Sequence, residues 1–136
     1  MPYVRKINFY ETDAMGVVHH ANYIKYFEEA RVDWLEQVGH PYEQIAAQGV
    51  HFAIVGVACD YLRAVKFGDT AKIVIGLKEL SSAKMVIDFC LTVGDAVCAK
   101  GEGSFCAVSV ASGSPKIVSL KRELPQFFAL LESIRK

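Results

Sequence analysis

The sequence has no excess of charge of either sign. Lys and Arg together number 15, as do Asp and Glu, which gives a formal net charge of zero at neutral pH. Proteins that attract nucleic acids or anionic membrane surfaces over long range carry a positive field. We therefore expect no nucleic-acid partner and no role at a membrane surface.

Long hydrophobic runs are also missing. A helix that crosses a bilayer needs about 20 predominantly apolar residues, and the longest apolar stretches here, such as Val50–Cys59, are far shorter. The first residues, Met1–Lys6, lack the apolar core of a signal peptide. The sequence thus predicts a cytoplasmic protein without a membrane span.

The four cysteines show no Cys-x-x-Cys spacing and lie within apolar, strand-like runs. A four-cysteine zinc site needs paired ligands on turns, so we expect buried, reduced thiols. No repeat, low-complexity tract or Ser/Pro-rich linker divides the 136 residues. With 52% apolar residues the chain can offset the entropy of ordering, and residues 1–136 are predicted to form one domain.

One long helix is predicted near the N-terminus. A first strand is expected over Tyr3–Tyr10, followed by a turn-rich segment. Over Asn22–Val38 the apolar residues recur at helical spacing, with Asn22 as the expected N-cap and Gly39 as the left-handed C-cap. A short second helix is expected over Tyr42–Gln48.

The remainder reads as long strands with short connections, which are typical of antiparallel neighbours. The predicted strands are Val50–Leu62, Thr70–Leu80, Lys84–Val93 and Ala96–Ser109, with Ile117–Leu120 as a possible extension of the edge and an amphipathic helix over residues 124–134.

These elements predict an α+β protein in which an antiparallel sheet of five or more strands wraps around one long central helix. The strand Phe52–Cys59 is apolar on both alternating faces, which one helix cannot cover, so a partner subunit is also expected. Glu28, Glu29 and Arg31 are expected on a solvated helix face, with Glu28 spaced to pair with Arg31.

The segment Tyr10–Tyr23 combines a carboxylate, a glycine turn, two imidazoles and the start of a helix within 14 positions. A carboxylate such as Asp13 can attack a thioester carbonyl or activate a water, and a helix N-terminus stabilises the oxyanion that develops. Asp13 can equally cap a turn, and a structural and a substrate-orienting role for His20 both remain open.

Two segments carry a family resemblance. They are Thr12-Asp13-x-x-Gly16-Val17-Val18-x-His20-x-x-Tyr23, followed by Glu29-Ala30-Arg31, and the later Asp60–Asp69. They resemble the 4-hydroxybenzoyl-CoA thioesterase-like family of the hotdog superfamily, in particular the branch that includes the acyl-CoA thioesterase associated with the Tol-Pal system.

The resemblance implies a hotdog fold that hydrolyses acyl-CoA, with no metal or organic cofactor. It also implies a homotetramer built from dimers, with active sites at the dimer interface. It assigns Asp13 as nucleophile or general base and places His20 beside it. Residues Gly16, Val17 and Val18 would help to hold the thioester, and Tyr23 would line the acyl pocket or anchor the helix.

This chain departs from the family pattern at three positions. His19 stands where many relatives carry Tyr or Phe, Ala64 where Pro is common, and Lys66 where many have Arg. His19 is therefore a candidate for shaping the acyl pocket, and Arg63 and Lys66 for contacts with the CoA phosphates.

Two functions compete with hydrolysis. One is hydration or dehydration of an acyl thioester, which the placement of Asp13 before Gly16 and the helix disfavours. The other is a non-catalytic module that binds acyl-CoA or acyl carrier protein, which would usually be fused to an output domain. The acyl group and the choice between CoA and acyl carrier protein stay open.

Overall fold

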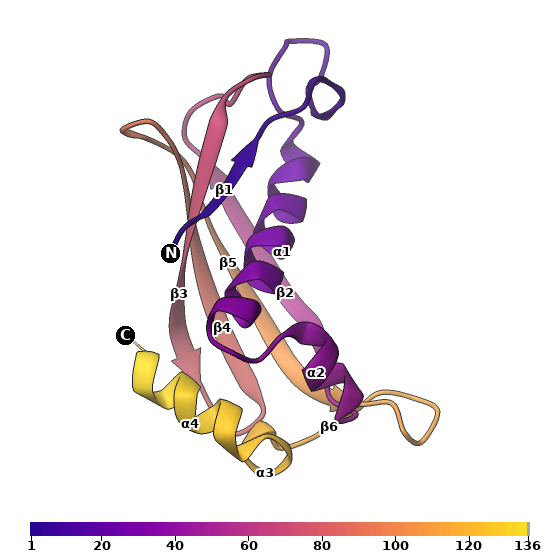
Figure 1. The fold of residues 1–136 in the computed structure, drawn as a ribbon. Coiled ribbons are helices and arrows are strands. Elements are labelled where there is room, and N and C mark those ends of the chain that lie inside the picture. Colours follow the sequence, from indigo (N-terminus) through magenta and orange to yellow (C-terminus); the bar gives the residue numbers. More distant parts are fainter. Residues whose placement is uncertain (136) are drawn as a thin grey trace.

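The computed structural model describes residues 1–135 (Figure 1). In chain order its elements are β1 (Tyr3–Lys6), the 3₁₀ turn η1 (Phe9–Glu11), α1 (His20–Gln37), α2 (Tyr42–Ala47), β2 (His51–Tyr61), β3 (Thr70–Leu80), β4 (Lys84–Val93), β5 (Ala96–Ser109), β6 (Lys116–Ile117), α3 (Leu120–Glu123) and α4 (Pro125–Ile134).

The strands form one antiparallel sheet in the order β1-β3-β4-β5-β2, with the short β6 paired to β5. The sheet curls, and α1 runs across its inner face (Figure 1). The α+β fold with a sheet around one long helix is therefore confirmed. Since β1 and β2 are the outer strands of this order, β2 has one free edge.

The core lies between α1 and the inner face of the sheet. Alternate residues of β3 and β4 point inward, among them Ile73, Leu77 and Ile87, and are buried. Phe27 of α1 stacks on Phe89 of β4 with ring centroids 4.6 Å apart. The helix passes close to β5 because Gly101 has no side chain: a Cβ there would overlap the Phe27 ring.

The start of α1 differs from the prediction. The helix begins at His20, and its N-cap is His19, whose Nδ1 accepts a hydrogen bond from the Ala21 N–H at 3.1 Å. Asn22 lies inside the helix because its side-chain amide donates to the Glu11 carbonyl oxygen at 2.8 Å. At the other end Gly39 has a φ of +85°, which confirms the left-handed cap.

Two predicted strands are shorter than expected. The first strand ends at Lys6, because residues 9–11 form the 3₁₀ turn η1, in which Glu11 is buried and pairs with Arg5. Near the C-terminus β6 comprises Lys116 and Ile117, and after a last bond from the Val118 N–H to the Ala107 carbonyl the chain leaves β5, because Ser119 caps the helix that starts at Leu120.

Burial corrects two further expectations. Arg31, expected on a solvated face, is only 6% exposed and packs over the Phe105 ring. The burial expected for the cysteines holds for Cys98 but is wrong for Cys59, Cys90 and Cys106, which are partly exposed on a strand edge or an outer sheet face.

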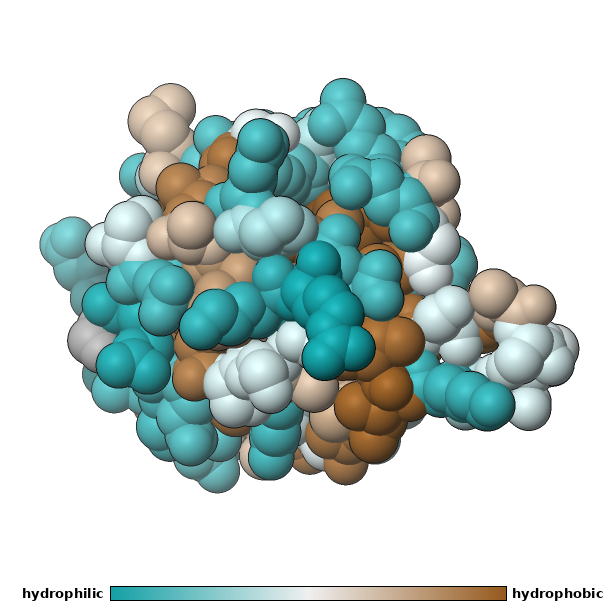
Figure 2. Space-filling view, turned by 90° about the horizontal axis from the view of Figure 1, so that it is seen from below, coloured by the Kyte–Doolittle hydropathy of each residue, from teal (hydrophilic) through white to brown (hydrophobic). Residues whose placement is uncertain are grey.

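The loop before α1 lies at one end of the molecule and α3 at the other (Figure 1). Figure 2 shows the α3 end, where hydrophilic side chains cover most of the surface and the connection between β5 and β6 projects to one side. Within residues 1–135 no helix has both the length and the apolar character that a membrane crossing requires.

Candidate active site

Asp13 lies on a tight loop whose backbone is fixed on both sides. The Asp13 N–H donates to the Val17 carbonyl at 2.8 Å, and the Gly16 N–H donates to the Asp13 carbonyl at 3.0 Å. Gly16 has a φ of +80°, a conformation that residues with a Cβ rarely adopt. The loop therefore presents Asp13 on a short, closed turn.

The Asp13 carboxylate itself takes part in this turn. Its Oδ1 accepts a hydrogen bond from the Met15 N–H at 2.8 Å, the contact by which Asp stabilises turns. This bond fixes the orientation of the carboxylate and leaves Oδ2 without a hydrogen bond from residues 1–135. Asp13 can thus both stabilise the turn and take part in chemistry, because Oδ1 accepts the turn hydrogen bond and Oδ2 is left for a reacting group.

A second pair of backbone contacts anchors the loop to the chain after β2. Val17 forms an antiparallel bridge with Lys66, and the Val18 N–H donates to the Val65 carbonyl at 2.7 Å. Val18 and Val65 are buried. Segments more than forty residues apart in the sequence therefore meet at this end of the sheet.

Between them lies a cavity of about 290 Å³. Its walls come from the loop, the first turn of α1 and the segment at the end of β2, and they comprise Asp13, Met15, Val17, Val18, His20, Tyr23, Tyr61, Leu62, Arg63 and Ala64. The cavity joins a carboxylate, an imidazole and a guanidinium to an otherwise largely apolar wall.

Two tyrosines form part of the cavity wall. Tyr23 is buried and meets Tyr61 edge to face, with ring centroids 4.9 Å apart, a favoured arrangement of aromatic pairs. Burial raises the pKa of Tyr23 above its ordinary value, so the phenol stays protonated. The Tyr61 hydroxyl donates to the His20 carbonyl at 3.1 Å and joins β2 to the first turn of α1.

The side chains of His19 and His20 occupy different positions. His20 lines the cavity, whereas His19 caps α1 and stacks on His20 with ring centroids 4.2 Å apart. The N-terminus of α1, an 18-residue helix, points its positive dipole end toward this region. Negative charge that develops near Asp13 and His20 is stabilised by that end of the helix.

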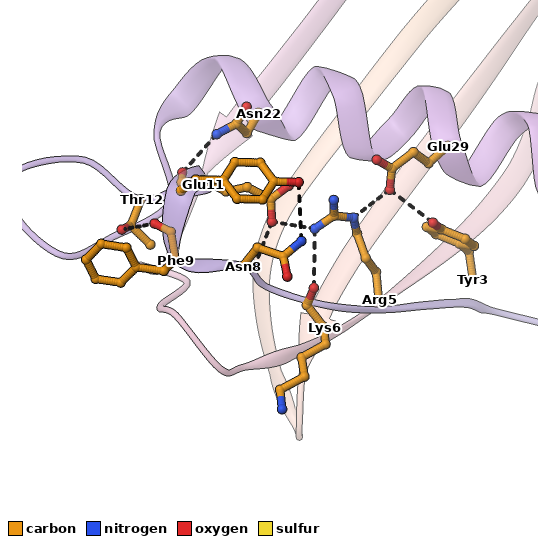
Figure 3. A network of polar contacts seen from close by, with 10 residues as sticks. Tyr3, Arg5, Lys6, Asn8, Phe9, Glu11, Thr12, Asn22 and Glu29 are labelled. Carbon is orange, nitrogen blue, oxygen red and sulfur yellow. Dashed lines mark hydrogen bonds and ion pairs between the residues drawn. The ribbon is translucent and has the colours of Figure 1, made fainter.

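A polar network joins β1, η1 and α1 next to the loop (Figure 3). Glu11, 6% exposed, accepts from the Asn8 N–H at 2.8 Å and pairs with Nη1 of Arg5 at 2.5 Å. Nε of Arg5 pairs with Glu29 of α1 at 2.6 Å, and the Tyr3 hydroxyl donates to the same Glu29 oxygen at 3.0 Å. The network joins β1, η1 and α1 two residues before Asp13.

Charge pairing dominates this network. Burial disfavours the charged form of Glu11, but hydrogen bonds from Arg5 and Asn8 outweigh it and hold the pKa of Glu11 below its ordinary value. Burial likewise opposes the charge on Arg5, and its bonds to Glu11 and Glu29 raise its pKa. The Glu11 carbonyl oxygen also accepts a hydrogen bond from the His19 N–H at 3.0 Å. The Arg5–Glu11 ion pair therefore helps to hold the N-cap of α1 in place.

The model of the thioesterase-like superfamily matches residues 7–129, which include the loop, α1 and the sheet. This chain belongs to the thioesterase-like superfamily. The resemblance drawn from the sequence motif is confirmed.

Individual relatives of this thioesterase-like protein agree. A 1,4-dihydroxy-2-naphthoyl-CoA hydrolase of Nostoc punctiforme is 31% identical over 124 residues, which cover 90% of this chain and 80% of that protein. The acyl-CoA thioesterase YbgC of Haemophilus influenzae is 26% identical over 124 residues and 90% of both chains. The protein is accordingly a thioester hydrolase.

Solved structures share the fold. A crystal structure of a hypothetical protein from Aquifex aeolicus superposes with a TM-score of 0.86 at 33% identity and covers 94% of this chain and 98% of that chain. A DHNA-CoA thioesterase from Staphylococcus aureus gives a TM-score of 0.91 at 20% identity, with 98% of this chain and 89% of that chain covered. At that identity the second match shows the fold alone.

Six of the residues singled out in this thioesterase-like sequence meet at the cavity: Asp13, Val17, Val18, His20, Tyr23 and Arg63. Three do not line it. Gly16 forms the turn, His19 caps the helix, and Lys66 is exposed and contributes its backbone to the bridge with Val17.

The structure adds Met15, Tyr61, Leu62 and Ala64 to the wall. Tyr61 was missed because only the packing of α1 against the sheet brings the end of β2 to the start of α1; its aromatic side chain at the end of a predicted strand was the available signal. Within residues 1–135 no three His, Cys, Asp or Glu side chains gather as a metal site would require.

Proposed function

We propose that this protein hydrolyses acyl-CoA thioesters to free acid and CoA at the cavity beside Asp13. The observation that carries the proposal is the position of the Asp13 carboxylate, which is held through one oxygen by Met15 and lies in the wall of a cavity at the N-terminus of α1. The names of relatives that act on acyl-CoA and naphthoyl-CoA thioesters support the substrate class.

Two routes fit this geometry. In the first, the free oxygen of Asp13 attacks the thioester carbonyl, the carbon–sulfur bond breaks, and CoA leaves as a thiolate that takes a proton from water. Water then hydrolyses the mixed anhydride and restores the carboxylate. In the second, Asp13 removes a proton from a water that attacks the carbonyl directly; the carbon–sulfur bond then breaks, and the CoA thiolate takes that proton and leaves as the thiol. In both, the positive end of α1 stabilises the oxyanion.

Other residues take supporting roles in this proposal. His20, which lines the same cavity as Asp13, orients the thioester, and Tyr23 and Val18 form the apolar side of the acyl site. Arg63, exposed at the rim, is placed to meet a CoA phosphate. Lys66, also exposed but outside the wall, contributes charge near the entrance.

We further propose that a second copy of the chain pairs with the free edge of β2. Ile54 and Val55 are each 56% exposed and Val57 is 51% exposed on this strand. An exposed apolar edge strand is a template for pairing, and a twofold partner would cover this patch. The homotetramer and the cytoplasmic location expected from the sequence stay predictions.

The test of the catalytic proposal is release of CoA thiol from acyl-CoAs by the wild type, by Asp13→Asn and by Asp95→Asn. Asp95 is an exposed turn residue between β4 and β5 and serves as the matched control. Asp13→Asn is expected to lower kcat by at least about a hundredfold, with unchanged unfolding and oligomer mass, while Asp95→Asn keeps wild-type turnover.

Three results would contradict this proposal or favour a rival. Equal turnover by Asp13→Asn and wild type would remove Asp13 from the mechanism. Binding of acyl-CoA without thiol release would favour the non-catalytic module. Loss of an unsaturated acyl-CoA absorbance without thiol release would favour hydration.

A further inference from the structure

A second cavity lies further along the seam between α1 and β2 and shares no lining residue with the first. Its volume is about 150 Å³. Its walls include Ile24 and Phe27 of α1 and Ile54 and Val57 of β2, and the aromatic rings of Phe89 and Phe105 lie at the sheet side. An apolar cavity of about this size can hold a benzene-sized group.

Three charged residues line this otherwise apolar cavity, and of these Lys25 and Glu28 are exposed whereas Arg31 is buried. Arg31 is 6% exposed, its guanidinium carbon lies 4.7 Å from the centre of the Phe105 ring, and its Nη1 is buried without a hydrogen bond to residues 1–135. The nearest carboxylate, that of Glu28, is 4.0 Å from Nη2 and 64% exposed, a geometry that contributes little.

The positive charge of the buried Arg31 guanidinium favours an anionic ligand. Desolvation lowers its pKa, but a guanidinium keeps its charge in proteins. A buried charge whose carboxylate partner is exposed and 4.0 Å away is poorly compensated. A neutral acceptor would satisfy Nη1 but leave the charge uncompensated, whereas a carboxylate does both and can bind the planar guanidinium through two parallel hydrogen bonds.

The position of Arg31 relates it to the active site. His20, Ile24, Phe27 and Arg31 recur at spacings of four, three and four on α1, so they share one helix face. The bond from Tyr61 to His20 places the end of β2 at the start of α1, and Val57 and Ile54 then follow α1 in the opposite direction. The helix rises about 16 Å from His20 to Arg31, and the Arg31 side chain shortens this gap because it leans back toward the N-terminus of α1, where its guanidinium lies near Glu28.

We propose that the second cavity binds the far end of an extended acyl group whose terminus is a carboxylate held by Arg31. This inference rests on the function proposed above and names a substrate class for it: ω-carboxyacyl-CoA thioesters. The thioester lies at Asp13, the methylene chain lies along the apolar seam, and the terminal carboxylate neutralises the buried guanidinium. A second copy paired on β2 would cover the seam from outside.

The first test compares acyl-CoAs that differ only at the tail. For the wild type, kcat/KM is expected to be about tenfold higher for suberyl-CoA than for octanoyl-CoA, the ratio that one charge-assisted contact supplies. Succinyl-CoA should show no such advantage over butyryl-CoA, because its short chain cannot reach Arg31. Equal rates for suberyl-CoA and octanoyl-CoA would overturn the proposal.

Substitution of Arg31 tests whether this residue causes the preference for suberyl-CoA. Arg31→Met keeps a long side chain over Phe105 and removes the charge, and it should bring the ratio of suberyl-CoA to octanoyl-CoA close to one. Lys25→Met removes an exposed cation from the same cavity wall and should leave the ratio at its wild-type value. A ratio that falls only in Lys25→Met would assign the preference to the surface and overturn the proposal.

Inhibition of the wild type gives a measurement that does not depend on the folding of a variant. Free suberate should inhibit octanoyl-CoA hydrolysis more strongly than free octanoate. If instead neither acid is preferred and Arg31→Met converts an oligomer to monomers, the carboxylate that meets Arg31 belongs to a second copy and the proposal is wrong. If no acyl-CoA is hydrolysed but suberate binds more tightly than octanoate by calorimetry, the catalytic proposal fails and the Arg31 site stands.

Discussion

The Tyr61 hydroxyl donates a hydrogen bond to the carbonyl oxygen of His20 over 3.1 Å. This contact joins the last residue of β2 to the first residue of α1, 41 positions apart in the sequence. The two side chains also line the same cavity. The packing of α1 against the sheet thereby brings a residue of the edge strand into contact with the helix end on which the proposed chemistry depends.

Removing the Tyr61 hydroxyl should loosen this junction. Tyr61→Phe keeps the ring packed on Tyr23 but loses the hydrogen bond, and we expect it to lower the free energy of unfolding by about 1 kcal/mol. We expect kcat/KM to fall a few-fold because the first turn of α1 is less firmly held. Urea unfolding and thiol release measure the two effects. Tyr10→Phe, which alters an 80% exposed ring, is the control, and an equal loss in both variants would refute the role of the junction.

Arg5 should matter more for stability than its position near the N-terminus indicates. Arg5→Met leaves Glu11 buried beside Glu29 without their shared cation, and loss of one member of such a pair should lower the free energy of unfolding by about 3 kcal/mol. Urea unfolding measures this change. Lys6→Met, on the adjacent exposed position of β1, should be nearly neutral, and similar losses in the two variants would argue against the network.

The same network predicts a dependence of stability on acid. Burial acts to raise the pKa of Glu11, but the hydrogen bonds from Arg5 and Asn8 prevail and keep it below its ordinary value of 4.5. A lowered carboxyl pKa contributes stability that is present above the unfolded-state pKa and is lost as the pH falls through the folded-state pKa. Unfolding free energies should thus fall more steeply below pH 4.5 in the wild type than in Glu11→Gln. Parallel curves for the two proteins would exclude Glu11 as a source of this dependence.

A charge on the free edge of β2 should disrupt association. Val55→Lys places an ammonium group on the strand proposed to pair with a second copy, and edge lysines oppose such pairing. Light scattering should then report a smaller particle than for the wild type. Val74→Lys is closely matched, since Val74 on β3 is 55% exposed against 56% for Val55, and it should leave the mass unchanged. A wild type that is monomeric would contradict the proposed pairing.

Local patterns in the sequence predicted much of the fold because they depend on neighbours along the chain. Helical spacing over residues 22–38 and the glycine at position 39 predicted the long helix and its end, and strand-like runs with short turns predicted the antiparallel sheet. The motif from Thr12 to Tyr23 predicted the family. The helix and strand signals rest on backbone conformation and periodicity, and the motif rests on the identity of nearby residues, all of which a segment carries by itself.

Only the tertiary structure decided how distant residues meet. The sequence placed the start of α1 at Asn22, but the Asn22 side chain reaches back to Glu11 and His19 caps the helix instead. Tyr61 enters the cavity wall because α1 packs against the end of β2. The spacing of Arg31 from Glu28 predicted a residue on the helix surface. Arg31 is instead buried over the Phe105 ring, because the curled sheet covers that face of α1. Burial and long-range hydrogen bonds depend on which segments pack together, and no local pattern contains that information.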